Sequence, residues 1–294
     1  MTVRTLDDAT VGTIALGDLA VRRLGFGAMR ISSARNADGQ VDRQEAIRLC
    51  RRVYERGVNF FDVANIYGYG ECEKIVAEAL HPYPKDLIIG TKAGYKPIRM
   101  EPGMRVLPAY GPPEHIKEEC EKSLQRLKID CIDLYQVHTP DPEVPWEDTV
   151  GAFADLQKAG KVRHVGVSNV SAEQLARAQK VCKIVSVQNR YNLGVRDSEA
   201  VLEACERDGV TFIPFRPVDL RQSSGEDVTK TIADEKGVLS QQVAIAWLLR
   251  HSKSMLPIPG TSKVAHADQN IDAAWVSLTD AEMARLDAAA KAAA

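Results

Sequence analysis

The sequence predicts an α/β protein that folds as a (β/α)8 TIM barrel, with an N-terminal β-hairpin and additional C-terminal helices. Short apolar segments alternate with segments of helical period along most of the chain. This alternation favours a parallel sheet, and the eight apolar segments that we count favour closure of that sheet into a barrel. No linker or low-complexity run interrupts the 294 residues, so we expect a single barrel domain over residues 1–294.

The N-terminal part is predicted to form a hairpin and then the first barrel strand. Residues 11–22 alternate apolar and polar side chains around Gly12 and Gly17, which is typical of a short hairpin. Residues 23–30 follow as the first strand. The run Gly25-Phe26-Gly27 lacks the third glycine and the strand-turn-helix context of a dinucleotide fingerprint, so a Rossmann fold is not indicated. Small residues at this strand end would instead let a ligand approach the backbone closely.

The remaining elements are predicted from the apolar and helical periods. Further strands are expected near residues 59–64, 86–92, 131–138, 162–168, 184–190, 210–215 and 255–259. Helices are expected near residues 43–56, 71–80, 113–127, 146–159, 172–180 and 196–208, with additional ones near 240–250 and 279–292.

One long connection, residues 93–112, contains aromatic and apolar side chains among prolines and glycines. Long loops within compact domains usually have a function, so we expect this one to cover the barrel mouth, with a disordered crossing as the alternative. Its candidate contact residues are Tyr95, Met100, Met104, Leu107 and Tyr110.

Composition excludes several classes of function. A net charge of -2 without a clustered basic face gives no case for nucleic-acid binding. No run of apolar residues is long enough for a membrane span, and the polar, acidic start does not match a signal peptide, so a cytoplasmic location is expected. The sequence has no H-x-H or H-E-x-x-H pattern, so we expect no metal and do not favour a metal-dependent barrel hydrolase. It does not determine the oligomeric state.

Four chemically active side chains fall at the ends of three successive predicted strands. Asp62 and Tyr67 follow one strand, Lys92 ends the next and His138 ends the third. Catalytic groups collect at the carboxyl ends of barrel strands, so these four are expected to share one pocket. Each alone has an ordinary structural interpretation. Together they suggest that Lys92, with Asp62 as its counter-charge, lowers the pKa of Tyr67 from its usual value of about 10.

This set resembles the Asp-Tyr-Lys-His tetrad of the aldo-keto reductase family, in its bacterial form. The similarity extends from about Arg23 to Ala273. It includes the runs Val165-Gly166-Val167-Ser168-Asn169, Val187-Gln188-Asn189-Arg190-Tyr191-Asn192 and Ile258-Pro259-Gly260-Thr261-Ser262-Lys263.

The resemblance implies reduction of an aldehyde or ketone by hydride transfer from NADPH, with NADH still possible. Tyr67 would be the general acid, assisted by Lys92 and Asp62. His138 would donate a hydrogen bond that orients the carbonyl, or would relay a proton. Two alternatives stay open: a cofactor-binding regulatory subunit with little turnover, and an alcohol dehydrogenase working in the opposite direction.

The resemblance also implies the contacts with the cofactor. Ser168, Asn169 and Gln188 would bind the nicotinamide carboxamide, and Phe215 would stack on the ring. Hydroxyls and a lysine at a helix start would hold the 2′-phosphate, although His266 stands where many relatives have arginine. The full predicted set is Gly27, Ala28, Met29, Ser168, Asn169, Gln188, Phe215, Arg216, Pro217, Arg221, Gly260, Thr261, Ser262, Lys263, His266, Gln269 and Asn270.

Two expectations are less determined by the sequence. Arg216 and Arg221 lie where many relatives have a glycine-containing run, and they either grip the pyrophosphate or are surface charges. The small-molecule carbonyl substrate is not identified. Its pocket is expected to be open and apolar, lined by Met29, Ile66, Tyr69, Tyr95 and Trp146.

Overall fold

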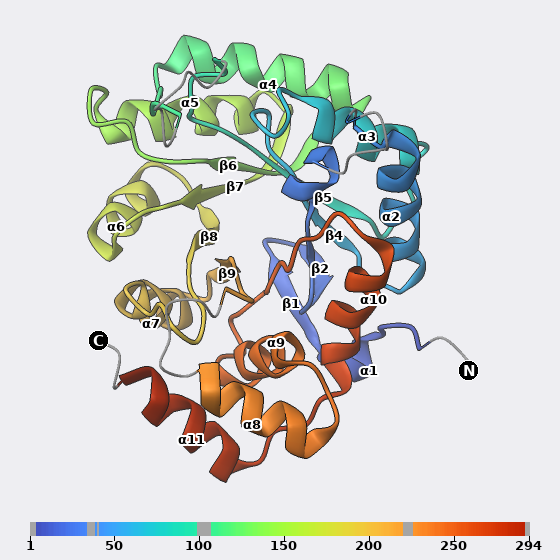
Figure 1. Ribbon diagram of the computed structural model, residues 1–294. Helices are drawn as coiled ribbons and strands as arrows, with labels where there is room; N and C mark the ends of the chain where they lie inside the picture. Colours follow the sequence, from blue (N-terminus) through green and yellow to red (C-terminus); the bar gives the residue numbers. More distant parts are fainter. Residues whose placement is uncertain (1–3, 34–38, 40, 99–106, 220–225, 292–294) are drawn as a thin grey trace.

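The structure is a computed structural model that describes residues 4–33, 39, 41–98, 107–219 and 226–291. Its central feature is a parallel sheet of seven strands, in the order in which they occur in the chain, which curves into a barrel inside a ring of helices (Figure 1). The strands are β3 (Phe26–Gly27), β4 (Phe60–Asp62), β5 (Ile88–Ala93), β6 (Ile132–Val137), β7 (Val162–Ser168), β8 (Ile184–Arg190) and β9 (Thr211–Phe215). The predicted barrel architecture is therefore confirmed.

The predicted N-terminal hairpin is also confirmed. Strands β1 (Thr13–Leu16) and β2 (Leu19–Arg22) pair antiparallel, apart from the main sheet. Leu16 and Val21 are fully buried and join the apolar cluster that fills the lower part of the barrel interior. The hairpin thus closes the end of the barrel opposite to the carboxyl ends of its strands.

The first barrel strand is shorter than the predicted residues 23–30. β3 has only two residues, Phe26 and Gly27, which pair with Phe61 and Asp62 of β4. Because β4 ends at Asp62, the chain beyond Gly27 has no further partner there and turns into the 3-10 helix η1 (Ala28–Ser33).

The predicted strand at residues 255–259 is not formed as a regular strand, although the segment does close the barrel. Pro257 and Pro259 have no backbone N–H and cannot continue a ladder on both sides. Their carbonyls accept hydrogen bonds from Gly25 and Gly27, at 2.9 and 3.3 Å. On the other side, Leu256 N donates to the carbonyl oxygen of Phe212 in β9 at 2.9 Å.

The helices mostly follow the predicted ranges. Around the barrel they are α2 (Arg43–Glu55), α3 (Glu71–Leu80), α4 (Pro113–Leu127), α5 (Trp146–Lys158), α6 (Ala172–Val181), α7 (Glu199–Asp208), α9 (Ser240–His251) and α10 (Val264–Asp272). Shorter or peripheral elements are α1 (Asp8–Val11), η2 (Ala273–Trp275) and α11 (Asp280–Lys291). The sequence analysis missed α8 (Glu226–Lys236), whose Ile232 and Ala233 are buried.

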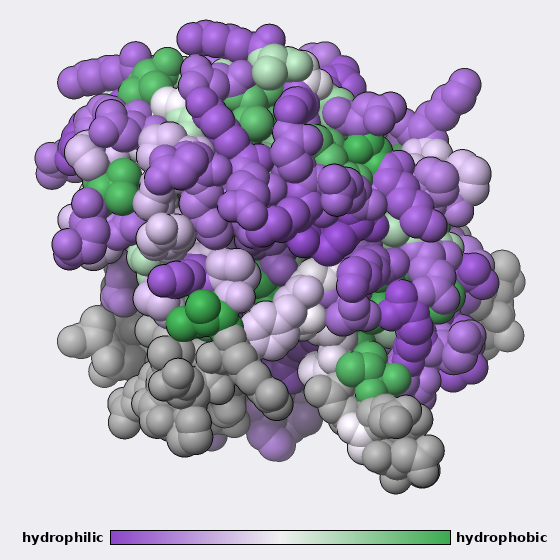
Figure 2. Space-filling view, turned by 90° about the horizontal axis from the view of Figure 1, so that it is seen from above, coloured by the Kyte–Doolittle hydropathy of each residue, from purple (hydrophilic) through white to green (hydrophobic). Residues whose placement is uncertain are grey.

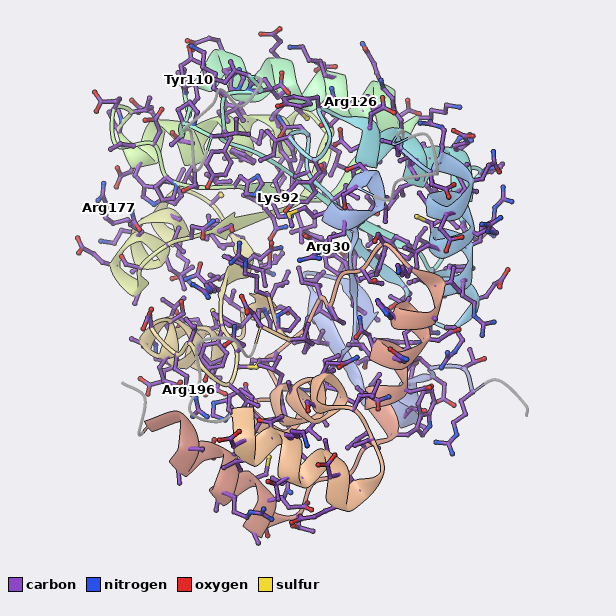
Figure 3. The ribbon with its side chains drawn as sticks, in the orientation of Figure 1. Arg30, Lys92, Tyr110, Arg126, Arg177 and Arg196 are labelled. Atoms are coloured by element: carbon purple, nitrogen blue, oxygen red, sulfur yellow. The ribbon has the colours of Figure 1, made fainter. Side chains whose placement is uncertain are left out.

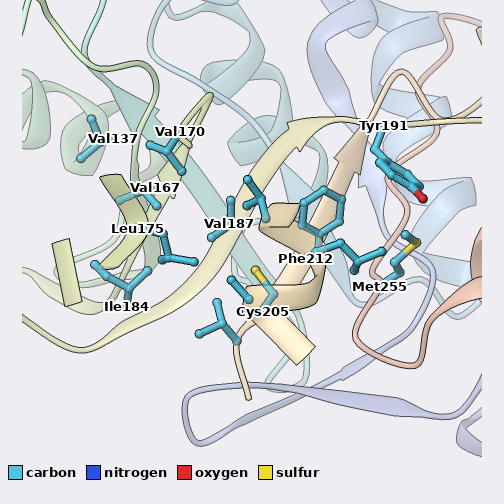
Figure 4. Close-up of a cluster of buried hydrophobic side chains, with 14 of the residues drawn as sticks. Val137, Val167, Val170, Leu175, Ile184, Val187, Tyr191, Cys205, Phe212 and Met255 are labelled. Carbon is cyan, nitrogen blue, oxygen red and sulfur yellow. The ribbon is translucent and has the colours of Figure 1, made fainter. Parts of the chain in front are cut away.

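The main core lies between the sheet and the helices. Outward-facing residues of neighbouring strands, such as Val137, Val167 and Val187, pack with Leu175 and Cys205 of the covering helices (Figure 4). The outer face seen in Figure 2 is largely hydrophilic, with apolar residues in small separate areas. In the described part of the chain, every helix is too short or too polar to cross a bilayer. These cores hold the strand ends in fixed positions around the barrel mouth.

Candidate active site

The centre of the site is a buried ion pair between Asp62, the last residue of β4, and Lys92 on β5. The Lys92 ammonium donates to both carboxylate oxygens of Asp62 at 2.7 Å and to the carbonyl oxygen of Val63 at 2.9 Å. Figure 3 shows Lys92 inside the ring of helices, and its side chain is 0% exposed. Burial lowers the pKa of Lys92, and the Asp62 carboxylate opposes this shift. A lysine buried this deeply requires such a partner.

Tyr67 and His138 lie above this pair. The Lys92 Nζ atom is 5.2 Å from the centre of the Tyr67 ring, and the Tyr67 and His138 rings are 5.8 Å apart. The Tyr95 ring packs edge-on against His138 at 4.7 Å. The structure therefore brings all four residues of the predicted tetrad together.

The pKa of Tyr67 does not shift in the direction that the sequence analysis expected. Burial, and then the Asp62 carboxylate, raise the pKa of the phenol well above its usual value. The three N–H donors of Lys92 go to Asp62 and Val63, so the ammonium charge is largely compensated beneath the ring. At neutral pH the phenol consequently keeps its proton, which is the state that a general acid requires.

His138 is neutral at pH 7. Burial, and then the charge of Lys92, lower the pKa of His138 well below its usual value. Its Nδ1 atom is buried and has no hydrogen-bond partner within the described residues. Buried polar atoms are normally paired, so an unpaired ring nitrogen in the wall of a site suits a bound molecule or water.

The polar residues expected to hold the nicotinamide lie side by side. Ser168 and Gln188 are register neighbours on β7 and β8, and Asn169 N donates to the carbonyl oxygen of Gln188 at 3.0 Å. The Asn169 amide donates to the carbonyl oxygen of His138 at 2.9 Å. The Gln188 amide has a partner that the sequence did not indicate, since it donates to Asp62 Oδ1 at 2.8 Å.

One functional candidate was missed altogether. Gln136 lies on β6, two residues before His138, and is fully buried. Its amide nitrogen is 3.4 Å from Asp62 Oδ1. The available signal was its position, because a polar residue at an inward-facing place in an apolar strand needs a partner inside the barrel.

The predicted cofactor residues after β9 have mixed surroundings. Phe215 is partly buried at the end of the strand, and Pro217 is buried. Arg216 has a left-handed backbone, with φ of 54°, and an exposed side chain whose Nη1 atom is 3.8 Å from Asp219 Oδ2. A phosphate at Arg216 would therefore share the guanidinium with a carboxylate. Arg221 lies outside the described residues.

The predicted phosphate segment leads directly into α10. Gly260 lies so close to β3 that a Cβ atom there would be 2.3 Å from the carbonyl oxygen of Gly27, so both positions need glycine. Lys263 is exposed at the N-terminal end of α10, and its N–H donates to Thr261 Oγ1 at 3.2 Å. Ser262 is partly buried. These features make an open N-terminus that fits an anion.

The rest of α10 is firmly attached to the barrel. Asp268 accepts hydrogen bonds from Arg52 on α2 at 3.0 Å and from the buried Arg56, which caps the end of that helix, at 2.5 Å. The predicted contact residues differ in exposure: His266 is exposed, Gln269 is partly buried and Asn270 is buried.

Four of the five predicted substrate residues lie at or near the mouth. Met29 on η1 and Tyr69 are each 50% exposed, and Ala28 beside Met29 is buried. The Tyr67–Tyr69 loop packs on η1, since Gly68 lies against Ser32. Ile66 is partly buried in the same loop.

Trp146, the fifth predicted substrate residue, does not line an open pocket in this structure. It is 6% exposed within the core between sheet and helices, and its indole N–H donates to the carbonyl oxygen of Gln174 in α6 at 2.9 Å. This hydrogen bond satisfies its only polar group at the α5–α6 contact, in the layer between sheet and helices.

The predicted lid is described only at its two ends. Tyr95 forms a β-bridge with Ala109, and Tyr110 packs against His115 with 4.8 Å between ring centroids. Met100 and Met104 lie outside the described residues. Over the part of the chain that the structure describes, no group of His, Cys, Asp and Glu could hold a metal ion.

Comparison with known proteins gives consistent results. The model of the aldo/keto reductase family matches residues 23–291. An uncharacterized oxidoreductase of Schizosaccharomyces pombe is 38% identical over 287 residues, covering 96% of this chain and 91% of that protein. Pyridoxine 4-dehydrogenase of Escherichia coli is 36% identical over 285 residues, covering 94% and 97%. The structure of an aldo-keto reductase from Klebsiella pneumoniae in complex with NADPH has a TM-score of 0.78 and 25% identity, covering 98% and 95%.

Proposed function

Given that this chain belongs to the aldo/keto reductase family and is an oxidoreductase acting on carbonyl compounds, we propose that it reduces an aldehyde or ketone with NADPH, using Tyr67 as the general acid. The observation that carries this proposal is the buried Asp62–Lys92 pair beneath two neutral proton-bearing side chains, Tyr67 and His138. NADPH is favoured because the similar Klebsiella pneumoniae enzyme binds it.

The chemistry follows from the charge that develops on the substrate. When bound, NADPH would supply a hydride to the carbonyl carbon, and negative charge would then develop on the carbonyl oxygen. Preorganised donors around that oxygen lower the barrier. Tyr67 transfers its phenolic proton to the oxygen, and His138 orients the carbonyl through an N–H hydrogen bond. Asp62 holds the Lys92 ammonium 5.2 Å from the centre of the ring that gives up this proton.

The residues around the mouth provide places for each part of the cofactor. Ser168, Asn169 and Gln188 would hold the carboxamide. Because the Gln188 amide nitrogen already donates to Asp62, its carbonyl oxygen is the group left to accept from the ligand. Phe215 offers a ring face for stacking. The 2′-phosphate would lie at the start of α10, and Gln269 and Asn270 would contact the adenine.

We expect a substrate with an aromatic or bulky apolar body. The mouth presents Met29, Tyr69 and Tyr95, which are all large and apolar or aromatic. The related Escherichia coli protein is named for oxidation of pyridoxine, an aromatic alcohol. This name favours aromatic aldehydes such as pyridoxal in the substrate panel, and also the reverse, alcohol-oxidising direction.

The proposal is tested by titrating the purified protein with NADPH and NADH while following protein fluorescence. A panel of aldehydes and ketones, including pyridoxal, is then assayed by the absorbance of the reduced nicotinamide. We expect tighter binding of NADPH and turnover of at least one aromatic aldehyde. If the protein binds neither NADPH nor NADH, the proposal is wrong. Binding without turnover across the panel would favour the regulatory alternative.

A further inference from the structure

The Asp62 carboxylate accepts more hydrogen bonds than those from Lys92. Its Oδ1 atom accepts from the amide of Gln188 at 2.8 Å and lies 3.4 Å from the amide nitrogen of Gln136. Both glutamines are buried, at 3% and 0% exposure. Three side chains on three different strands therefore converge on one carboxylate oxygen.

The contacts continue one layer further down the barrel. Gln136, Gly166 and Ser186 are register neighbours on β6, β7 and β8. The Ser186 hydroxyl donates to the Gln136 amide oxygen at 3.4 Å. Gly166 makes this possible, because a Cβ atom there would lie 2.2 Å from Ser186 Oγ and 3.0 Å from Gln136 Cγ. The contact between Ser186 and Gln136 thus requires a glycine at position 166.

A buried ion pair needs such support. Removing a carboxylate and an ammonium from water is costly, and the cost is offset only when the remaining lone pairs are also hydrogen-bonded. The amides of Gln136 and Gln188 supply these bonds and restrict rotation of the carboxylate. Because Lys92 donates to both carboxylate oxygens, a fixed Asp62 also fixes the ammonium beneath Tyr67.

We propose that Gln136 is a positioning residue for the Asp62–Lys92 pair, and that Gln188 combines this role with its contact to the cofactor. The Gln188 amide would then contact both the cofactor and Asp62, and would so couple cofactor binding to the geometry of the ion pair. This inference rests on the proposed function. The two glutamines lie at different depths in the barrel. Gln188 is the register neighbour of Ser168 at the mouth, whereas Gln136 is the register neighbour of Gly166 one layer below.

Because only Gln188 lies where the cofactor would bind, substitutions of the two glutamines should have different effects. Gln136→Leu should lower kcat at saturating NADPH roughly fivefold and leave the Kd for NADPH within about twofold, because it loses a bond to a charged group but no ligand contact. Gln188→Leu should lower kcat and also weaken NADPH binding. In a Lys92→Met background, the effect of Gln136→Leu on kcat should disappear, since the pair through which it acts is gone.

The matched control is Thr211→Val. Thr211 is also buried inside the barrel and is the register neighbour of Ser186, but its hydroxyl donates to the carbonyl oxygen of Ala15 in the N-terminal hairpin at 2.8 Å and not to the Asp62–Lys92 pair. This variant should lose stability without losing kcat. If Gln136→Leu behaves like Thr211→Val, the inference is wrong. Gln136→Met, which keeps the side-chain length without the donor, replaces Gln136→Leu if the latter does not fold.

A second readout does not depend on activity. In the protein without cofactor, the effects of Gln136→Leu and Asp62→Asn on the denaturation midpoint should be non-additive, whereas Thr211→Val and Asp62→Asn should add. Additive effects of Gln136→Leu and Asp62→Asn would overturn the inference. A wild-type protein that turns over no carbonyl would instead overturn the proposed function, and this stability cycle would still decide the inference.

Discussion

The ring of Tyr67 meets the ring of His138 edge to face, with 5.8 Å between centroids and 82° between planes. Burial shifts the pKa of both groups away from neutrality, upward for the phenol and downward for the imidazole. Both side chains are consequently uncharged at pH 7. A carbonyl oxygen placed beside them would meet two neutral donors, and the Lys92 Nζ atom lies 5.2 Å from the centre of the phenol ring.

Tyr67→Phe tests the general acid. We expect kcat to fall by roughly 10²- to 10⁴-fold, the usual contribution of a positioned proton donor, while the Kd for NADPH stays unchanged. Stopped-assay turnover and fluorescence titration measure the two quantities. Tyr54→Phe is the control, since Tyr54 donates to Asp86 at 2.8 Å on the outside of the barrel. Substantial remaining turnover in Tyr67→Phe would remove this residue as the acid.

His138 should make stability depend on pH. The pKa of His138 is depressed in the folded protein, so below its ordinary value of 6.5 the unfolded chain binds more protons than the folded one. Stability contributed by the neutral imidazole is therefore lost as the pH falls from about 6.5 towards the folded pKa. Chemical denaturation at about pH 7 and pH 5 should show a smaller loss in His138→Gln than in wild type. The exposed His81→Gln is the control, and equal losses in all three proteins would contradict the prediction.

Lys263→Ala tests the site of the 2′-phosphate. Loss of a charged hydrogen bond should raise the KM for NADPH roughly tenfold, with little change for NADH, which lacks that phosphate. Lys183→Ala is the control, since Lys183 is an exposed lysine just before β8, at the opposite end of the barrel strands. Equal changes for the two nucleotides would place the phosphate elsewhere.

Tyr95→Ala tests the described part of the lid. The Tyr95 ring packs on His138 at 4.7 Å, so it borders the place where the carbonyl must lie. We expect kcat/KM for bulky aromatic aldehydes to fall several-fold more than that for small aliphatic ones, with the Kd for NADPH unchanged. Tyr110→Ala, which removes a ring packed on His115, should have a weaker effect. An unaltered substrate profile in Tyr95→Ala would count against a lid at this position.

The periodic features of the chain were predictable from the sequence. Apolar strands alternating with amphipathic helices determine the order of elements, and parallel strands bring their carboxyl ends together. Asp62, Lys92 and His138 could therefore be placed at one mouth without knowledge of any contact. The ends of strands were predicted less well, because the length of a strand depends on the strand with which it pairs. β3 stops at Gly27 because β4 ends at Asp62, and neither limit is visible in a local window.

Side-chain environments were the least predictable. Trp146 looked like a pocket residue, but the α5–α6 contact buries it and provides its hydrogen-bond acceptor. The sequence predicts a lowered pKa for Tyr67 because it places Lys92, with Asp62 as its counter-charge, in the same pocket. Burial of the phenol, and then the Asp62 carboxylate, raise the pKa of Tyr67 instead, and neither environment can be read from a local stretch of sequence. The second partner of Gln188 depends in the same way on three strands meeting across the barrel interior.

The barrel should open most readily between β9 and β3, at the segment that contains Pro257 and Pro259. Between β9 and β3 there is no continuous ladder: the Pro257 and Pro259 carbonyls accept isolated hydrogen bonds from the β3 side, and Leu256 N donates to Phe212 on the β9 side. The same segment runs on into α10, so a nucleotide bound at Lys263 would restrain the segment that joins β9 to β3. We expect the amide protons of Gly25 and Gly27 to exchange with deuterium faster than those of β6, and to slow markedly once NADPH is added.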